Sequence, residues 1–169
     1  SMKSIDVANT FISRHGGTHC ITNLKLNKLV FYAQVESLKK FGVPLFSDEI
    51  QAWGYGPVEP NVYRAFKKYG RGAITSPSSS FETTDRSVSI VDDIFNRFAE
   101  TTAFDLVTIS HRPDGAWAKT YSPDNDEVIS ADIILSSADL DNIPGCSFTD
   151  ALAEVERKWP NALKMLEDA

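Results

Sequence analysis

The sequence lacks long apolar runs, and it shows no signal for secretion. None of its stretches approaches the roughly 18 apolar residues that a membrane-spanning helix needs, so we expect no membrane association. The first residues contain neither the apolar segment nor the small-residue cleavage site of a secretory signal. We therefore expect a cytoplasmic protein.

Cysteine and histidine are also scarce, which argues against metal and disulfide chemistry. Cys20 and Cys146 lie far apart and form no Cys-x-x-Cys pair. His15 and His19 are separated by a Gly-Gly turn, so they do not share one face of a helix in the way that metal ligands would. The glycine-containing segments match neither a Walker loop nor a dinucleotide fingerprint. The sequence predicts no metal site and no cofactor.

Basic charge is in deficit, with 17 Lys and Arg against 23 Asp and Glu and a net charge of −6. Binding to a phosphate backbone depends on a basic surface, so a nucleic-acid partner is disfavoured and a DNA-binding autorepressor is the weakest alternative. The densest basic cluster has the spacing of a solvated helix face; it consists of Arg64, Lys67, Lys68 and Arg71.

The spacing of apolar residues along the chain predicts a mainly α fold, a compact helical bundle with at most a small β element near 50–56. A helix at about 22–41 is apolar on several faces and therefore belongs at the centre of the bundle. We expect the whole chain, 1–169, to form one domain. Further helices are expected at 4–15, from Pro60 to about Tyr69, at 88–98, 103–110, 116–120 and 131–137, and as a terminal pair split at Trp159-Pro160.

Two groups of residues are candidates for function. His111 lies directly after an apolar helix, and with Ser110 and Asp114 it offers the residue types of a hydrolase triad, although no nucleophile turn accompanies them. We favour a structural or partner-binding role over catalysis. In the structural interpretation, His111 caps the helix end and Trp117 packs over the turn. The second group is aromatic residues near Arg64, which are typical interface anchors but equally fit a core; it comprises Trp53, Tyr55, Tyr63 and Tyr69.

Three ordered motifs stand out along the chain. The first is LKLNKLVFYAQ at 24–34, the second is LF at 45–46 with IQAWGYGPV at 50–58 and VYRAF at 62–66, and the third is LVTISH at 106–111 with Trp117. Together they resemble the Panacea domain, the SocA-like antitoxin family found in phage-associated genes. Ser110 stands where the family usually has threonine, and Gly115-Ala116 where a proline usually precedes the tryptophan. The likeness covers about 5–121, and we expect 122–169 to form a helical C-terminal extension.

The resemblance implies a non-enzymatic antitoxin that neutralises its cognate toxin by direct protein–protein binding. No catalytic residue is assigned. The partner-binding residues expected from the motifs are the exposed members of a set of six, namely Trp53, Tyr55, Tyr63, Arg64, His111 and Trp117. Two alternatives stay open: a hydrolase or transferase that uses His111, and an adaptor that delivers its partner to a protease.

Overall fold

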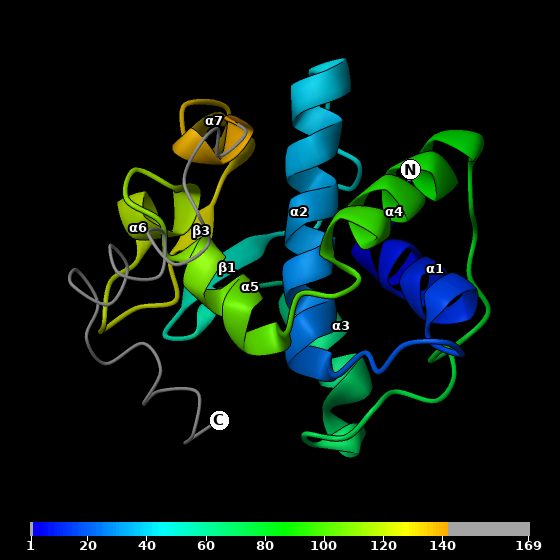
Figure 1. Ribbon diagram of the computed structural model, residues 1–169. Helices are drawn as coiled ribbons and strands as arrows, with labels where there is room; N and C mark the ends of the chain where they lie inside the picture. The colour runs from blue at the N-terminus through cyan, green and yellow to red at the C-terminus, as the bar shows by residue number, and fades with distance from the viewer. Residues whose placement is uncertain (1, 142–169) are drawn as a thin grey trace.

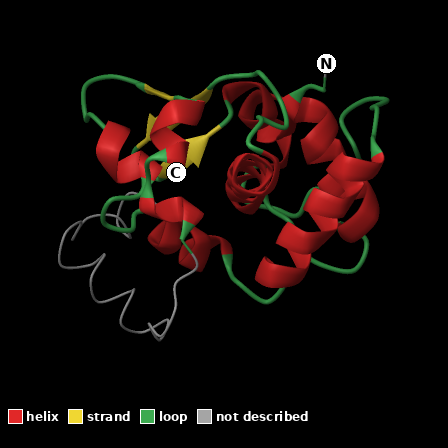
Figure 2. Cartoon of the chain, turned by 90° about the horizontal axis from the view of Figure 1, so that it is seen from above, coloured by secondary structure: helices red, strands yellow, loops and turns green. Residues whose placement is uncertain are grey.

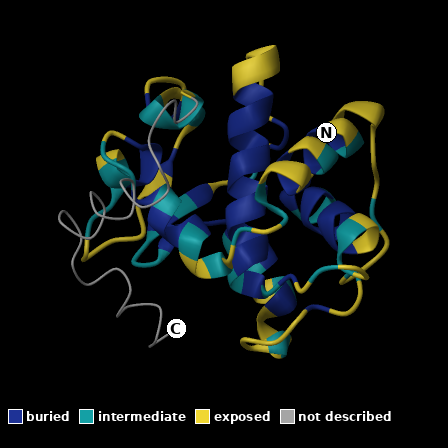
Figure 3. Cartoon of the chain, in the orientation of Figure 1, coloured by how far each residue is buried: buried dark blue, intermediate teal, exposed yellow. Residues whose placement is uncertain are grey.

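Helix α2, Asn23–Phe41, runs through the centre of the fold (Figure 1). The computed structural model describes residues 2–141, and residues 1 and 142–169 lie outside this description. The side chain of Thr22 accepts a hydrogen bond from the Lys25 N–H at the start of the helix, and Gly42 closes its end in the left-handed conformation. Most of α2 is buried, and its last residues, 39–41, are exposed (Figure 3). The prediction of a central helix at about 22–41 is confirmed.

The other helices lie on opposite sides of α2, which Figure 2 shows end-on. Helices α1 and α4 pack against α2 and against each other on one side. Helices α5, α6 and α7 and the strands lie on the other side, whereas α3 contacts both α1 and α2 (Figure 1). The bounds are α1 Ser4–His15, α3 Pro60–Phe66, α4 Asp85–Phe98, α5 Ala103–Ser110, α6 Ala116–Thr120 and α7 Ala131–Leu135, with 3-10 turns η1 Lys67–Tyr69 and η2 Ala138–Leu140.

A small antiparallel sheet takes the order β2-β1-β3, from strands β1 Ile50–Trp53, β2 Gly56–Val58 and β3 Val128–Ile129. The first two strands form a hairpin, and β3 pairs with the other edge of β1. The sequence predicts at most a small β element here, near 50–56. It misses β2 and β3 because a Gly-Pro-Val segment and a two-residue strand are too short to show alternation.

The mainly α fold with a small β element is confirmed, and the helix bounds differ from the predictions at a few ends. Helix α4 begins at Asp85, earlier than predicted, because Thr84 and Ser87 form a capping box there. Helix α7 ends at Leu135, and η2 follows it. The predicted helical extension beyond residue 141, with its Trp159-Pro160 break, lies outside the described residues. Within residues 2–141, no helix combines the length and apolar character needed to cross a membrane.

Candidate functional site

Two polar residues on α2 hold the second strand of the hairpin. The Lys28 ammonium donates to the carbonyl oxygen of Pro57 at 2.8 Å, and the Asn27 side-chain oxygen accepts from the backbone N–H of Glu59 at 3.1 Å. Lys28 is fully buried, and this burial lowers its pKa to about 7. The first two motifs therefore meet inside the molecule. Side chains of the first motif hold the backbone of the second motif in place.

The carboxylate of Glu59 joins two helices to the end of this hairpin. Its Oε2 accepts from the N–H of Val62 at 2.9 Å, which caps α3, and from the hydroxyl of Ser4 at 2.7 Å on α1. Its Oε1 accepts from the N–H of Asn61 at 3.2 Å. Glu59 is buried, and these donors compensate for the loss of water around its charge.

His111 and Trp117 are both 1% exposed and support the hairpin turn from within. The Nδ1 of His111 lies 2.7 Å from the Val107 carbonyl, and since a carbonyl only accepts, we assign the imidazole proton to Nδ1. The imidazole packs against Trp117 with ring centroids 3.7 Å apart, and the indole N–H of Trp117 donates to the Trp53 carbonyl at 2.6 Å. His111 thus lies at the helix end and packs against Trp117, the geometry that the structural interpretation predicts.

Ser110, His111 and Asp114 are not arranged as a nucleophile, its base and an orienting acid. The Ser110 hydroxyl donates to the Val107 carbonyl at 2.7 Å and lies 3.4 Å from the Nδ1 of His111, which already carries the proton. Asp114 is exposed, in a turn with φ of 61°. An activated serine needs an unprotonated base within reach, and this geometry does not provide one.

The buried imidazole predicts a specific dependence of stability on pH. Burial lowers the pKa of His111 from 6.5 to about 4 and outweighs its contacts with backbone carbonyls. Between pH 6.5 and 4 the unfolded chain binds a proton that the folded chain does not, so the free energy of unfolding falls as the pH falls through this window. Urea unfolding across this range should show a smaller loss for His111→Gln than for the wild type. Identical pH profiles would contradict a buried neutral imidazole.

Three aromatic rings cluster at the surface, and together with Arg64, which follows Tyr63 on α3 and donates to Asn61, we call them the aromatic patch: Trp53, Tyr55, Tyr63 and Arg64. The Trp53 ring makes edge contacts with Tyr55 at 6.0 Å and Tyr63 at 5.1 Å between centroids. Burial and the neighbouring Tyr63 raise the pKa of Tyr55. The three rings are half-buried and Arg64 is exposed. Rings from the hairpin and from α3 are thus held against each other at the surface.

The six residues named from the sequence divide into a surface group and an interior group. The four residues of the aromatic patch are accessible, whereas His111 and Trp117 lie beneath the hairpin and contact its backbone. Tyr69 lies outside the patch and packs near Phe66. Any contact of His111 or Trp117 with a partner is therefore indirect, through the shape of the hairpin.

Sequence reasoning missed the internal polar anchors Asn27, Lys28 and Glu59. A signal existed for two of them, because Asn27 and Lys28 interrupt the apolar surface of α2 on the side that the hairpin covers. The burial of Glu59 had no such signal, since a glutamate before a proline at a helix start also fits an exposed cap.

Comparison with known proteins identifies a family and a curated relative. The family model described as "Antitoxin SocA-like, Panacea domain" matches residues 26–118, more than half of the chain. Antitoxin SocA of Caulobacter vibrioides (strain NA1000 / CB15N) is 30% identical over 109 residues, covering 57% of this chain and 58% of that protein. The chain thus spans less than two thirds of this relative. No solved structure matches the chain.

Proposed function

Because this chain belongs to the family of SocA-like antitoxins with a Panacea domain, we propose that it is the antitoxin of a toxin–antitoxin pair and binds its cognate toxin directly. The partner is a protein, and neutralisation requires no catalytic step by this chain. The name of the relative, Antitoxin SocA, supports the antitoxin role. The observation that carries direct binding is the aromatic patch on the hairpin and α3.

The aromatic patch has the chemistry of an interface centre. Tryptophan, tyrosine and arginine are the residue types that most often dominate binding energy. The Trp53 ring is already held between Tyr55 and Tyr63, so little side-chain freedom is lost when a partner covers it. The net charge of −6 favours encounter with a basic toxin.

The enzymatic alternative has less support than binding. It requires His111 to act on a substrate, but the imidazole is 1% exposed and its proton faces the Val107 carbonyl. The adaptor alternative uses the same toxin-binding surface and adds delivery to a protease. The half-life of the toxin in cells with and without the protease separates the adaptor from simple blocking.

Substitution of Trp53 by alanine tests the patch. We expect Trp53→Ala to weaken toxin binding by about 30-fold or more, the effect of losing a central aromatic anchor. The toxin candidate is the product of the neighbouring gene, co-expressed with a tagged form of this chain. Affinity is measured on the purified complex, and rescue of growth is scored in the same cells. Tyr69→Ala is the matched control, because Tyr69 is a partly exposed aromatic outside the patch.

Three results would count against parts of the proposal. Growth rescue without a complex would contradict direct binding and favour catalysis, degradation or repression. Equal toxin affinities of Trp53→Ala and Tyr69→Ala would mean that the interface lies elsewhere on the protein. Neither rescue nor a complex with the wild type would contradict the antitoxin role for this pair. Urea unfolding of each variant shows whether a loss of binding reflects a loss of fold.

A further inference from the structure

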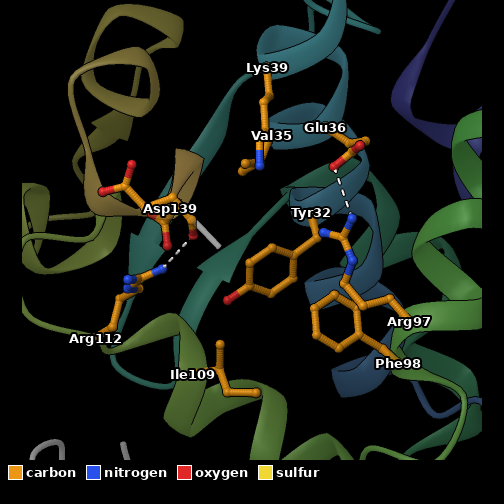
Figure 4. A pocket seen from close by; sticks show the side chains of 10 residues that line it. Tyr32, Val35, Glu36, Lys39, Arg97, Phe98, Ile109, Arg112 and Asp139 are labelled. Atoms are coloured by element: carbon orange, nitrogen blue, oxygen red, sulfur yellow. Dashed lines mark hydrogen bonds and ion pairs between the residues drawn. The ribbon is translucent and has the colours of Figure 1, made fainter. Parts of the chain in front are cut away.

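A pocket of about 230 Å³ lies away from the aromatic patch, between α2, the C-terminal ends of α4 and α5, and η2 (Figure 4). Its apolar walls include Phe98, Ile109 and the ring of Tyr32. The rings of Tyr32 and Phe98 pack with centroids 5.1 Å apart. These elements come from distant parts of the chain, and the patch proposed to bind the toxin shares no residue with the pocket.

Two buried polar atoms at this pocket have no hydrogen-bond partner within the described part of the chain: the Tyr32 hydroxyl and Oδ1 of Asp139. Tyr32 is 6% exposed, and Figure 4 shows its hydroxyl pointing into the space beside Arg112, Ile109 and Asp139. Burial and the nearby Asp139 carboxylate raise the pKa of Tyr32, so the phenol keeps its proton. Orphaned buried groups are rare and costly.

The partners of the other Asp139 oxygen show that this carboxylate is held in place. Oδ2 accepts from the N–H of Ala116 at 2.7 Å and from the hydroxyl of Ser137 at 3.3 Å. These bonds fix Asp139 between α6 and the end of α7, while its Oδ1 finds no donor among residues 2–141. Tyr32 and Asp139 both line the pocket, so its wall contains a hydroxyl and a carboxylate oxygen that have no hydrogen-bond partner among the described residues.

The pocket is lined by equal numbers of acidic and basic residues, and this equality helps to decide which class of ligand it can bind. The ionisable lining residues are three acids, Glu36, Asp139 and Asp141, and three bases, Lys39, Arg97 and Arg112. Arg97 donates to Glu36 at 3.5 Å, and Arg112 donates to the Asp141 carbonyl at 3.3 Å. With no net charge in the lining, neither an anion nor a cation is favoured over a neutral dipolar group.

We propose that this pocket binds a primary carboxamide on an aliphatic stem. The carboxamide oxygen accepts from the Tyr32 hydroxyl, its NH₂ group donates to Oδ1 of Asp139, and the stem packs against Phe98 and Ile109. One group thus supplies both missing partners. The same chemistry occurs at the end of a glutamine or asparagine side chain of a partner and in small free amides. The inference does not depend on toxin binding.

The test compares three probes with similar short alkyl stems: butanamide, butanoate and n-butylammonium. Each is titrated into the purified protein while NMR follows the Ile109 methyl and Tyr32 ring signals. We expect saturable shifts with butanamide and about tenfold weaker binding of either ion. Tyr32→Phe should weaken butanamide binding about tenfold, the effect of one lost hydrogen bond. It should also raise the melting temperature of the free protein, because the orphaned hydroxyl is gone.

The controls and contrary results are specific to this pocket. Tyr69→Phe, which removes a hydroxyl elsewhere, should leave butanamide binding unchanged. Absence of saturable shifts with butanamide, or tighter binding of either ion, would overturn the proposal. A lower melting temperature for Tyr32→Phe would also overturn it, since a bound water would then use the hydroxyl. Once amide binding is established, a toxin complex weakened by Tyr32→Phe assigns the amide to the partner, and an unchanged complex assigns it to a small molecule.

Discussion

Replacement of Trp117 by alanine is expected to lower the free energy of unfolding by about 3 to 5 kcal/mol, the usual cost of truncating a buried aromatic. Trp117 is 1% exposed and packs between His111 and Tyr121, with centroid separations of 3.7 and 4.6 Å. The substitution leaves a cavity and also removes the donor to the Trp53 carbonyl. Since a domain of this kind is stable by about 5 to 15 kcal/mol, much of the stability would be lost.

Urea denaturation followed by circular dichroism measures this effect, and Trp117→Phe is its matched control. Phenylalanine keeps an aromatic ring against His111 but lacks the indole N–H, so we expect a smaller loss, about 1 to 3 kcal/mol. Similar stabilities for the wild type and Trp117→Ala would contradict the packing described here. Under the proposed function, the affinity of Trp117→Phe for the toxin then reports how far the hairpin position depends on the indole hydrogen bond.

Replacement of Gly56 by alanine is expected to cost about 3 kcal/mol of unfolding free energy, from backbone strain and overpacking together. Gly56 has φ of 110°, a conformation that L residues rarely adopt. A Cβ at this position would lie 2.7 Å from Oγ of Ser110 and 2.8 Å from Cε of Lys28. Neither neighbour moves freely, because Lys28 is bound to Pro57 and Ser110 to Val107.

Gly42→Ala separates the two contributions. Gly42 also has a positive φ, 71°, but a Cβ there meets no atom within 4 Å, so only backbone strain of about 1 kcal/mol applies. Chemical denaturation should therefore give Gly56→Ala a much lower free energy of unfolding than Gly42→Ala. Equal losses of unfolding free energy in the two variants would mean that the side chains around Gly56 relax easily. That result would contradict the fixed positions of Lys28 and Ser110 described here.

The predictable parts of this fold were those encoded by neighbouring residues. The start and end of α2 followed from Thr22 and Gly42 because capping acts within one helical turn. The packing of Trp117 on His111 followed from a short spacing after α5. The motifs that resemble the Panacea domain identified the family.

The parts that were missed depend on pairings between distant segments. Strand β3 joins the sheet through Val128 and Ile129, which pair with Gln51 and Ile50 far away in the chain. The Lys28 bond to Pro57 and the position of Asp139 beside Tyr32 likewise require the tertiary fold. A sequence pattern gives the period of an element, but it does not say which distant element covers each face.

The anchors of the hairpin have a consequence for its evolution and engineering. Lys28 and Trp117 contact carbonyl oxygens of the hairpin, and Asn27 contacts a backbone N–H at its end, so all three contact main-chain atoms. Main-chain atoms are the same whatever side chains the hairpin displays. Outward-facing residues such as Trp53 and Tyr55 can therefore be exchanged while the loop keeps its position. Under the proposed toxin-binding role, the hairpin is a frame on which new partner specificities can be selected without redesign of the interior.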